Sequence, residues 1–106
     1  MDPKTQARYE IRAAIIKALA HPTRLFIVDE LGRAGQKCVC ELTEMVGADM
    51  STVSKHLAIL KSAGIVEVEK RGSMVFYRLR IRCALKFLDC VESVIACDAG
   101  EAALAR

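Results

Sequence analysis

The sequence predicts a small, mainly α-helical domain that contains one β-hairpin, and three observations support this prediction. The chain has 106 residues, a length that suits one domain and leaves no room for a doubly wound nucleotide-binding fold or a barrel enzyme. Apolar residues recur with helical spacing in five segments. Ahead of the last segment, polarity alternates with period two on both sides of a turn. We therefore expect a single domain over residues 1–106.

The first two helices are expected at residues 5–20 and 22–31. In the first, the apolar residues fall on one side. The dipeptide His21-Pro22 ends this helix, because proline disfavours helix in the residue before it. Pro22 can then occupy the first position of the second helix, which is expected to stop at Gly32 and to be followed by a loop at residues 32–37.

A short helix, a tight turn at residues 47–49 and a longer helix at about residues 50–63 follow. Asp49 is expected to cap the longer helix. In that helix, one set of residues forms a buried stripe, Val53, Leu57 and Leu60, and another set faces away from it, Ser51, Thr52 and Lys55, with Ser54 on the flank. The pattern resembles a helix-turn-helix.

The hairpin is expected at about residues 65–80, with a turn at residues 70–73. Val66 and Val68 fall on one face of its first strand, and the two residues Glu67 and Glu69 fall on the other. A hairpin with a basic tip directly after a helix-turn-helix resembles the wing of a winged helix-turn-helix domain.

A last helix is expected at residues 83–97. Three cysteines, Cys83, Cys90 and Cys97, repeat every seven residues along it, and Phe87 and Val94 lie between them. A stripe with this spacing is typical of a dimer seam. A chain this short also buries only a modest core. We therefore expect a homodimer formed through the helices at residues 5–20 and 83–97.

The positive charge is concentrated in one part of the chain. The formal net charge is +3, but residues 51–82 carry seven basic and two acidic side chains. A basic block in an otherwise neutral chain indicates a polyanionic partner. Serine, threonine and lysine side chains on an exposed helix suit hydrogen bonds to bases and phosphates, so DNA is the expected partner.

The motifs carry a family resemblance. The stretch STVSKHLAILKSAGIVEVEKRGSMVFYRL resembles the core of the ArsR/SmtB family of winged-helix repressors, LAHPTRLFIVDEL resembles its second-helix signature, and CVCEL resembles its arsenic and cadmium sensing box. The resemblance covers about residues 10–97. It implies a homodimer that binds operator DNA and leaves it when a toxic metal or metalloid binds.

The resemblance also implies which residues contact DNA. They are Ser51, Ser54 and Lys55, with Thr52 and His56 beside them. His56 fits a phosphate contact or a packing role as well as base reading. We add Arg71 at the hairpin tip, which is expected to meet phosphate or the minor groove.

Cys38 and Cys40 are the expected ligands of the inducing ion. In a regular helix, side chains two residues apart point in nearly opposite directions and cannot hold one ion, whereas in an extended or frayed segment they point the same way. We therefore expect the pair at a helix start, where the dipole lowers a thiol pKa, and we expect ion binding to unwind residues 38–40. The alternative is two buried structural thiols.

The sensing box departs from the family pattern in one respect. A third cysteine, three residues after the second, is replaced by Thr43, and residues 1–37 contain no cysteine. Cys90 or Cys97 is expected to supply a third ligand, with Cys83 less favoured. No histidine follows His56, so the family's zinc-type site on the last helix is absent. We expect As(III) or Sb(III) as the inducer, with Cd(II) or Pb(II) as alternatives.

Other functions stay open beside this one. The five cysteines also suit a repressor of the same fold that senses oxidants or persulfide. A thiol enzyme or metal carrier is less favoured, because the motif is not the Cys-x-x-Cys of a redox enzyme and no Gly-rich phosphate loop occurs. The chain lacks a signal peptide and an apolar run of roughly 18 residues that could span a membrane. We expect a cytoplasmic protein that is not an enzyme.

Overall fold

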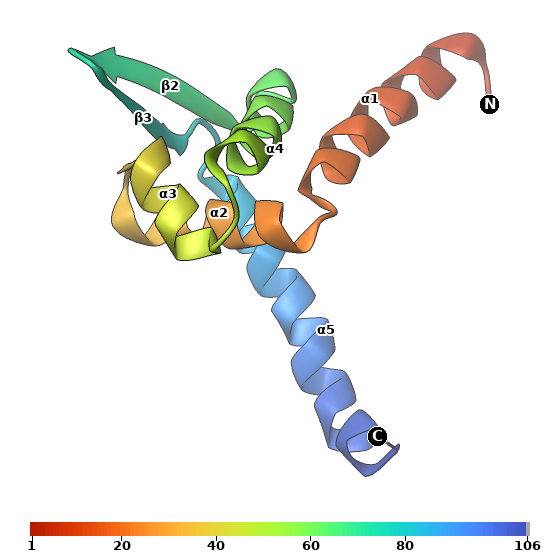
Figure 1. Cartoon of the computed structure of the whole chain (residues 1–106). Coiled ribbons are helices and arrows are strands. Elements are labelled where there is room, and N and C mark those ends of the chain that lie inside the picture. The colour runs from red at the N-terminus through yellow and green to blue at the C-terminus, as the bar shows by residue number, and fades with distance from the viewer. Residues whose placement is uncertain (106) are drawn as a thin grey trace.

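The computed structural model describes residues 1–105, with side chains described as far as Cys97. The elements in chain order are α1 (Pro3–Leu19), α2 (Pro22–Ala34), β1 (Lys37–Cys38), α3 (Val39–Val46), α4 (Met50–Ser62), β2 (Val66–Arg71), β3 (Met74–Leu79) and α5 (Cys83–Ala105). The helices α2, α3 and α4 form a central body, from which the β2–β3 hairpin projects on one side while α1 and α5 lead away in different directions (Figure 1). The structure confirms the predicted winged helix-turn-helix.

Local sequence signals set two helix starts, as predicted. Pro22 occupies the first turn of α2, and Nδ1 of His21 accepts a hydrogen bond of 3.1 Å from the Thr23 amide. At α4, a carboxylate oxygen of Asp49 accepts a 2.7 Å hydrogen bond from the Thr52 amide, which confirms Asp49 as the N-cap. Each cap satisfies an amide that the first helical turn leaves without a backbone partner.

The turn between α3 and α4 depends on Gly47. This residue has a φ of 78°, a left-handed conformation that glycine adopts without a steric penalty. Its amide donates to the Thr43 carbonyl at 3.0 Å and closes α3. Only Ala48 and Asp49 remain before α4 begins, so α3 and α4 are held in a close helix-turn-helix arrangement.

The second helix is longer than predicted. Gly32 lies inside α2, which continues to Ala34 and is followed by Gly35 with a φ of 89°. The reason for a glycine at position 32 is tertiary, because a Cβ there would lie 2.4 Å from a methyl carbon of Leu85 on α5. Gly32 is therefore a point of close approach between α2 and α5, and the prediction that it ends the helix is wrong.

The sheet contains a third strand, β1, that the sequence does not predict, since Lys37 falls in the expected loop and Cys38 at the expected helix start. Its antiparallel strands lie in the order β1-β3-β2, and Cys38 of β1 pairs with Phe76 of β3. The hairpin is also tighter than predicted, since β2 reaches Arg71 and the turn occupies residues 72–73 rather than 70–73. Through β1, the segment that precedes α3 is hydrogen-bonded to the wing.

The core lies where α2, α3, α4 and the base of the hairpin meet. The predicted stripe of α4 is fully buried, and it packs in one cluster with buried residues of the neighbouring elements: Ile27, Val28, Leu31, Leu42, Val53, Leu57, Leu60 and Ile65. Burial of an aliphatic side chain of this size contributes about 1.5–3 kcal/mol. These contacts fix α4 on the body while its opposite face stays in solvent.

The terminal helices contribute little to this core. Among the side chains described, α1 buries Ala18 and Leu19, and α5 buries Ala84 and Leu88. The Cα radius of gyration is 16.1 Å, above the roughly 13 Å of a compact domain of this length. The last helix also runs to Ala105, beyond its predicted end near residue 97. In the described part of the chain, no helix is both long enough and apolar enough to cross a membrane.

Replacement of Gly32 by alanine is expected to destabilise the fold by about 1 kcal/mol. Overpacking against Leu85 costs roughly 1–3 kcal/mol, while removal of a helical glycine recovers about 1 kcal/mol. Urea denaturation followed by circular dichroism measures the change. In the background of Leu85→Ala, the same substitution should cost less, because the obstructing side chain is gone. A Gly32→Ala variant more stable than the parent chain would contradict the close approach.

Candidate functional site

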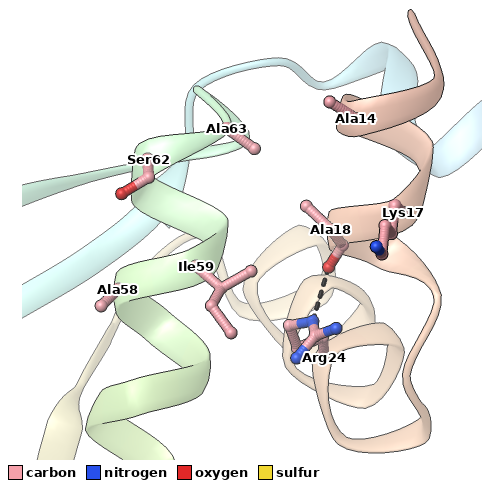
Figure 2. Close-up of a pocket in the computed structure, with 8 residues that line it drawn as sticks. All are labelled: Ala14, Lys17, Ala18, Arg24, Ala58, Ile59, Ser62 and Ala63. Carbon is pink, nitrogen blue, oxygen red and sulfur yellow. Dashed lines mark hydrogen bonds between the residues drawn. The ribbon is translucent and has the colours of Figure 1, made fainter. Parts of the chain in front are cut away.

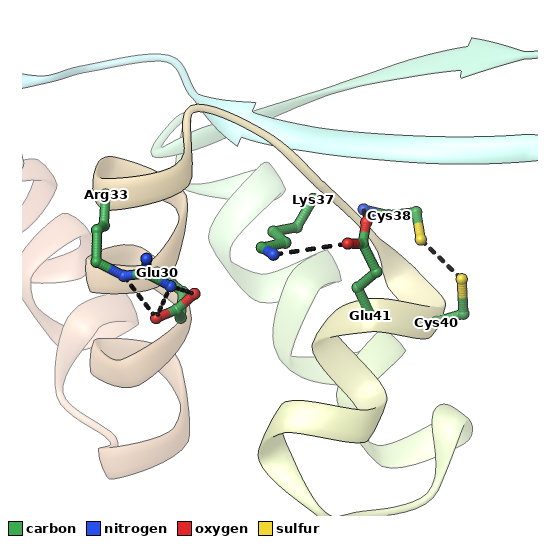
Figure 3. Close-up of polar contacts among 6 residues, drawn as sticks. All are labelled: Glu30, Arg33, Lys37, Cys38, Cys40 and Glu41. Carbon is green, nitrogen blue, oxygen red and sulfur yellow. Dashed lines mark hydrogen bonds and ion pairs between the residues drawn. The ribbon is translucent and has the colours of Figure 1, made fainter.

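Two cysteine thiols converge at the start of α3. Cys38 is the last residue of β1, Cys40 lies in the first turn of α3, and their Sγ atoms are 2.7 Å apart (Figure 3). The side chain of Cys38 is buried, whereas Cys40 is exposed. One sulfur is thus anchored in the interior while the other faces solvent, so a ligand can approach the pair from outside.

A change of backbone conformation brings the two sulfurs together. Cys38 is extended, with φ −81° and ψ 162°, and the helix begins at the next residue, Val39. The structure therefore places the pair at a helix start, as predicted. A regular helix does not run through both cysteines, because the extended residue Cys38 sits ahead of the helix and the sulfurs meet with α3 intact. Unwinding of residues 38–40 by a bound ion stays a prediction.

The Cys38 thiol is held in its neutral form. A hydrogen bond with the Cys40 sulfur raises the pKa of Cys38, and burial raises it further. The expectation that the helix dipole lowers this pKa is wrong, because the buried sulfur of Cys38 is hydrogen-bonded to the sulfur of Cys40. The Cys38 amide donates to Oε1 of Glu41 at 3.1 Å, and Oε2 of Glu41 lies 3.5 Å from Nζ of Lys37.

The predicted third ligand does not join the pair within this chain. Among the residues that the structure describes, no three His, Cys, Asp or Glu side chains are grouped to hold a metal ion. Cys83, Cys90 and Cys97 are exposed along α5, which leads away from the body that carries α3 (Figure 1). The donor set at the helix start is thus two thiols, which suit a soft ion and leave room for a further ligand from elsewhere.

The thiol pair lies where β1 meets α3, and these two elements contact the wing and α4, the elements expected to contact DNA. Cys38 pairs with Phe76 of β3, one of the two strands of the wing. Two residues after Cys40, the side chain of Leu42 is fully buried in the core cluster that also contains Val53 of α4. Cys38 is therefore linked to the wing by strand pairing, and α3 is linked to α4 by packing in the same core cluster.

The first half of α4 presents four of the predicted DNA-contact residues to solvent. Ser51, Thr52, Ser54 and Lys55 are all exposed. His56 differs from them, since it is half-buried and its Nδ1 lies 3.1 Å from Nη1 of Arg24 on α2. The side chain of His56 is thus directed toward the body of the domain.

The basic tip of the wing is partly paired within the chain. Nη2 of Arg71 lies 2.7 Å from a carboxylate oxygen of Glu69 and 2.7 Å from Oε1 of Gln36. Near the base of the hairpin, Nε of Arg78 lies 2.8 Å from Oε1 of Glu67. Exposed pairs of this kind contribute about 0–1 kcal/mol, so a phosphate can compete with them for Arg71.

Sequence reasoning missed a polar cluster that joins α1, α2 and α4. Nε of Arg24 donates to the Ala18 carbonyl at 2.6 Å, at the end of α1, in the groove between α1 and α4 (Figure 2). The rings of His21 and His56 lie with their centroids 4.4 Å apart. Arg24 and His56 are 32 positions apart in the chain, so no local spacing signals their contact.

An apolar groove opens between α1, α2 and α5. Its lining consists of apolar side chains, among them Ile16, Phe87 and Val91. Phe87 is 42% exposed, and the next apolar residues along α5, Val94 and Ile95, are 60% and 55% exposed. Large apolar side chains are thus left in solvent along this part of α5.

Comparison with known proteins identifies the family. The model of the bacterial regulatory protein, arsR family, matches residues 21–68. An uncharacterised HTH-type transcriptional regulator of Methanocaldococcus jannaschii is 40% identical over 85 residues, which cover 77% of this chain and 96% of that protein. A cadmium resistance regulatory protein homologue of Staphylococcus aureus is 37% identical, over 63% of this chain and 55% of its own length. The arsenical resistance operon repressor of Escherichia coli is 40% identical, over 61% and 56%. The chain thus spans about half the length of these last two relatives.

Solved structures are similar over nearly the whole chain. A homodimeric winged helix-turn-helix DNA-binding domain from Mycobacterium bovis is 30% identical, with a TM-score of 0.78, and the match covers 92% of this chain and 89% of that one. An antimony-specific transcriptional repressor is 29% identical, with a TM-score of 0.75, over 100% and 91%. The chain therefore belongs to the ArsR family of bacterial regulatory proteins and is a DNA-binding transcriptional regulator rather than an enzyme.

Proposed function

We propose that this chain is a cytoplasmic, homodimeric repressor that a thiophilic ion, arsenite or antimonite in the first place, releases from its operator by binding Cys38 and Cys40. The observation that carries the proposal is the convergence of the two sulfurs, 2.7 Å apart, at the junction of β1 and α3. Thiol ligands select soft ions. Relatives named for arsenical and cadmium resistance, and the antimony-specific structural neighbour, support this class of inducer.

The homodimer is supported by the apolar surface that α1 and α5 leave uncovered. The groove beside Phe87 and Val91 and the exposed Val94 and Ile95 form one side of α5. A second copy of the same surface would remove these side chains from water, at about 25 cal/mol for each Å² of apolar area buried. The Mycobacterium bovis neighbour is itself homodimeric. A dimer would present two α4 helices to successive major grooves, about 34 Å apart.

Operator recognition is assigned to the exposed first half of α4 and to the wing. Ser51, Thr52, Ser54 and Lys55 are free to reach base edges and phosphates, and Arg71 can exchange its partners within the chain for phosphate. His56 is assigned a supporting role, because its ring is engaged by Arg24. The side chain of Asp49 caps the N-terminus of α4. This is the end of the helix that is proposed to enter the major groove.

Release follows from where the ion binds. An ion that draws the two sulfurs into its coordination shell moves the buried side chain of Cys38, and with it the β1–β3 pairing and the start of α3. The wing and α4, which are the two elements proposed to contact DNA, then shift relative to each other. As a result, the dimer is less complementary to the two half-sites of the operator. A hundredfold loss of DNA affinity needs about 2.7 kcal/mol of coupling. A third ligand, Cys90 or Cys97 of the partner subunit in the dimer, would complete a trigonal site.

Oxidation of the same pair is the second candidate function, and the short distance between the sulfurs favours it. Reaction of both thiols with hydrogen peroxide would form one disulfide and two molecules of water. Peptide mass spectrometry after peroxide treatment, compared with metal titration of the reduced protein, separates the two functions. A disulfide between Cys38 and Cys40 that abolishes DNA binding, together with no effect of arsenite, would favour the redox sensor.

Substitution of Lys55 by alanine is expected to weaken operator binding by about 1–3 kcal/mol, the cost of one lost base contact. The matched control is Lys61→Ala, since Lys61 is exposed at the other end of the same helix and should leave binding unchanged. Fluorescence anisotropy with a duplex selected by the parent chain from a randomised library measures both. Normal operator binding by Lys55→Ala would show that another face of the domain reads DNA.

Substitution of Cys38 or Cys40 by serine should leave DNA binding intact and abolish release by arsenite. A serine oxygen keeps the size of the side chain but is a poor ligand for a soft ion. Cys83→Ser serves as the control that retains both properties. Anisotropy titrations of the protein–DNA complex with arsenite, cadmium and zinc report release. If arsenite still released the Cys38→Ser, Cys40→Ser double variant from DNA, the inducing ion would have to bind the cysteines of α5 instead.

The raised pKa of Cys38 predicts how the site responds to pH. Cys38 is expected to be the slowest of the five cysteines to react with iodoacetamide near neutral pH, because the thiolate is the reactive form. Ion binding must displace its proton, so affinity for Cd(II) should rise with pH. Mass spectrometry of partly alkylated protein ranks the cysteines. Equal rates for Cys38 and the exposed Cys90 would contradict the burial and the hydrogen bond that raise this pKa.

A further inference from the structure

We propose that Arg24 and His56 form a lock that positions α4 against the end of α1, and that operator affinity falls when His56 takes up a proton. In this lock His56 is a positioning residue, which acts on DNA through the placement of its neighbours in α4. The inference rests on the proposed function in one respect, namely that the first readout is operator binding.

One guanidinium group bridges two helices. Nε of Arg24 donates to the carbonyl of Ala18, near the end of α1, at 2.6 Å, and Nη1 lies 3.1 Å from Nδ1 of His56 on α4. Figure 2 shows Arg24 between the two helices, with its hydrogen bond to Ala18. The planar fork of arginine can hold two acceptors at fixed angles, which the single ammonium group of lysine cannot reproduce. Arg24 therefore links a helix of the proposed dimer surface to the helix that reads DNA.

The bridge requires one protonation state of His56. Arginine has five N–H donors and no acceptor, so Nδ1 of His56 must accept and the neutral ring carries its proton on Nε2. Protonation of Nδ1 would place an N–H donor opposite the guanidinium donor. The hydrogen bond would be lost and two positive charges would face each other.

The surroundings of His56 disfavour this protonation. Burial, the neighbouring His21 ring and Arg24 all lower the pKa of His56. The groups that face the cluster are His21 from the segment before α2, Arg24 from α2 and, on the wall of the same groove, Lys17 from α1. Because the unfolded chain binds the proton more readily than the folded one, stability is complete above the ordinary pKa of histidine and declines as pH falls below it.

The position of His56 connects this titration to DNA binding. His56 follows Lys55 directly in α4 and is one turn beyond Thr52. When the bridge opens, the first half of α4 is no longer fixed against α1, so the proposed DNA contacts lose their preset geometry. A histidine that touched phosphate directly would have the opposite effect, because its protonation would add a cation to the DNA-binding surface.

Two substitutions of His56 separate these roles. In His56→Asn the amide oxygen can take the place of Nδ1, so the Arg24 contact is kept without a titrating group. In His56→Gln the amide lies one bond further out, where Nε2 was, and the contact is lost. His21→Asn is the matched control, because asparagine is a good N-cap for α2 and removes the other ring.

The experiment measures the Kd for the selected duplex at about pH 8 and about pH 5.5, on either side of the histidine range. The parent chain and His21→Asn should bind more weakly at the lower pH, by at most about tenfold, because pH 5.5 lies about one unit below the ordinary pKa of histidine and the pKa of His56 is lower than that. For His56→Asn the two values should agree within about a factor of two, and His56→Gln should bind weakly at both pH values by a similar factor.

Two results would overturn the lock. One is tighter binding by the parent chain at the lower pH, and the other is an equal loss of affinity in His56→Asn. If none of the proteins binds a selected duplex, the proposed function fails and the lock is tested by thermal unfolding alone. The melting temperature should then fall with pH in the parent chain and stay level in His56→Asn, and equal falls in both would reject the lock.

Discussion

The arrangement of the site depends on the change from extended to helical backbone at Cys38. This residue is at once the end of β1, the residue that precedes α3 and the buried member of the thiol pair. An extended residue followed by a helix allows two side chains with this spacing to meet, which a continuous helix would not. The β1–β3 pairing holds Cys38 in that conformation. The same short segment thus creates the site and connects it to the wing.

The rest of the molecule divides its surfaces between two tasks. Helix α4 buries Val53, Leu57 and Leu60 in the core, while the opposite face of its first half stays in solvent and Asp49 caps its start. The terminal helices α1 and α5 bury few side chains in the core of their own domain and expose apolar side chains instead. Core packing therefore holds α4, the helix proposed to read DNA, on the body of the domain. The stability of the chain would depend on the proposed partner subunit as well as on its own core.

Features that depend on nearby residues could be predicted from the sequence. The Asp49 cap and the start of α2 at Pro22 are local hydrogen-bond and steric effects, and the structure confirms both. The strand β1 could not be predicted, because a two-residue strand exists only through its pairing with β3. The prediction that Gly32 ends the helix is wrong for the same kind of reason, since this glycine leaves space for Leu85 of α5.

At the candidate site, too, the features set by nearby residues could be predicted from the sequence, and those set by tertiary contacts could not. The placement of Cys38 and Cys40 at a helix start followed from their spacing, which excludes a regular helix. The direction in which the pKa of Cys38 shifts did not follow from the sequence. The hydrogen bond with Cys40 and burial raise this pKa, and these outweigh the helix dipole. The partners of Arg71 and His56, Gln36 and Arg24, lie 35 and 32 positions away in the chain. Contacts across such separations carry no local signal.

In the proposed function, a ligand on the thiol pair changes the conformation of both elements that are proposed to read DNA, α4 and the wing. Amide hydrogen exchange of the free protein, with and without arsenite, tests it most directly, because exchange reports local opening along the backbone. The expected result is a change in protection from β1 through the first half of α4 and along β3, which disappears in the Cys38→Ser, Cys40→Ser double variant. A change confined to α5, or one that persists in that variant, would contradict the claim.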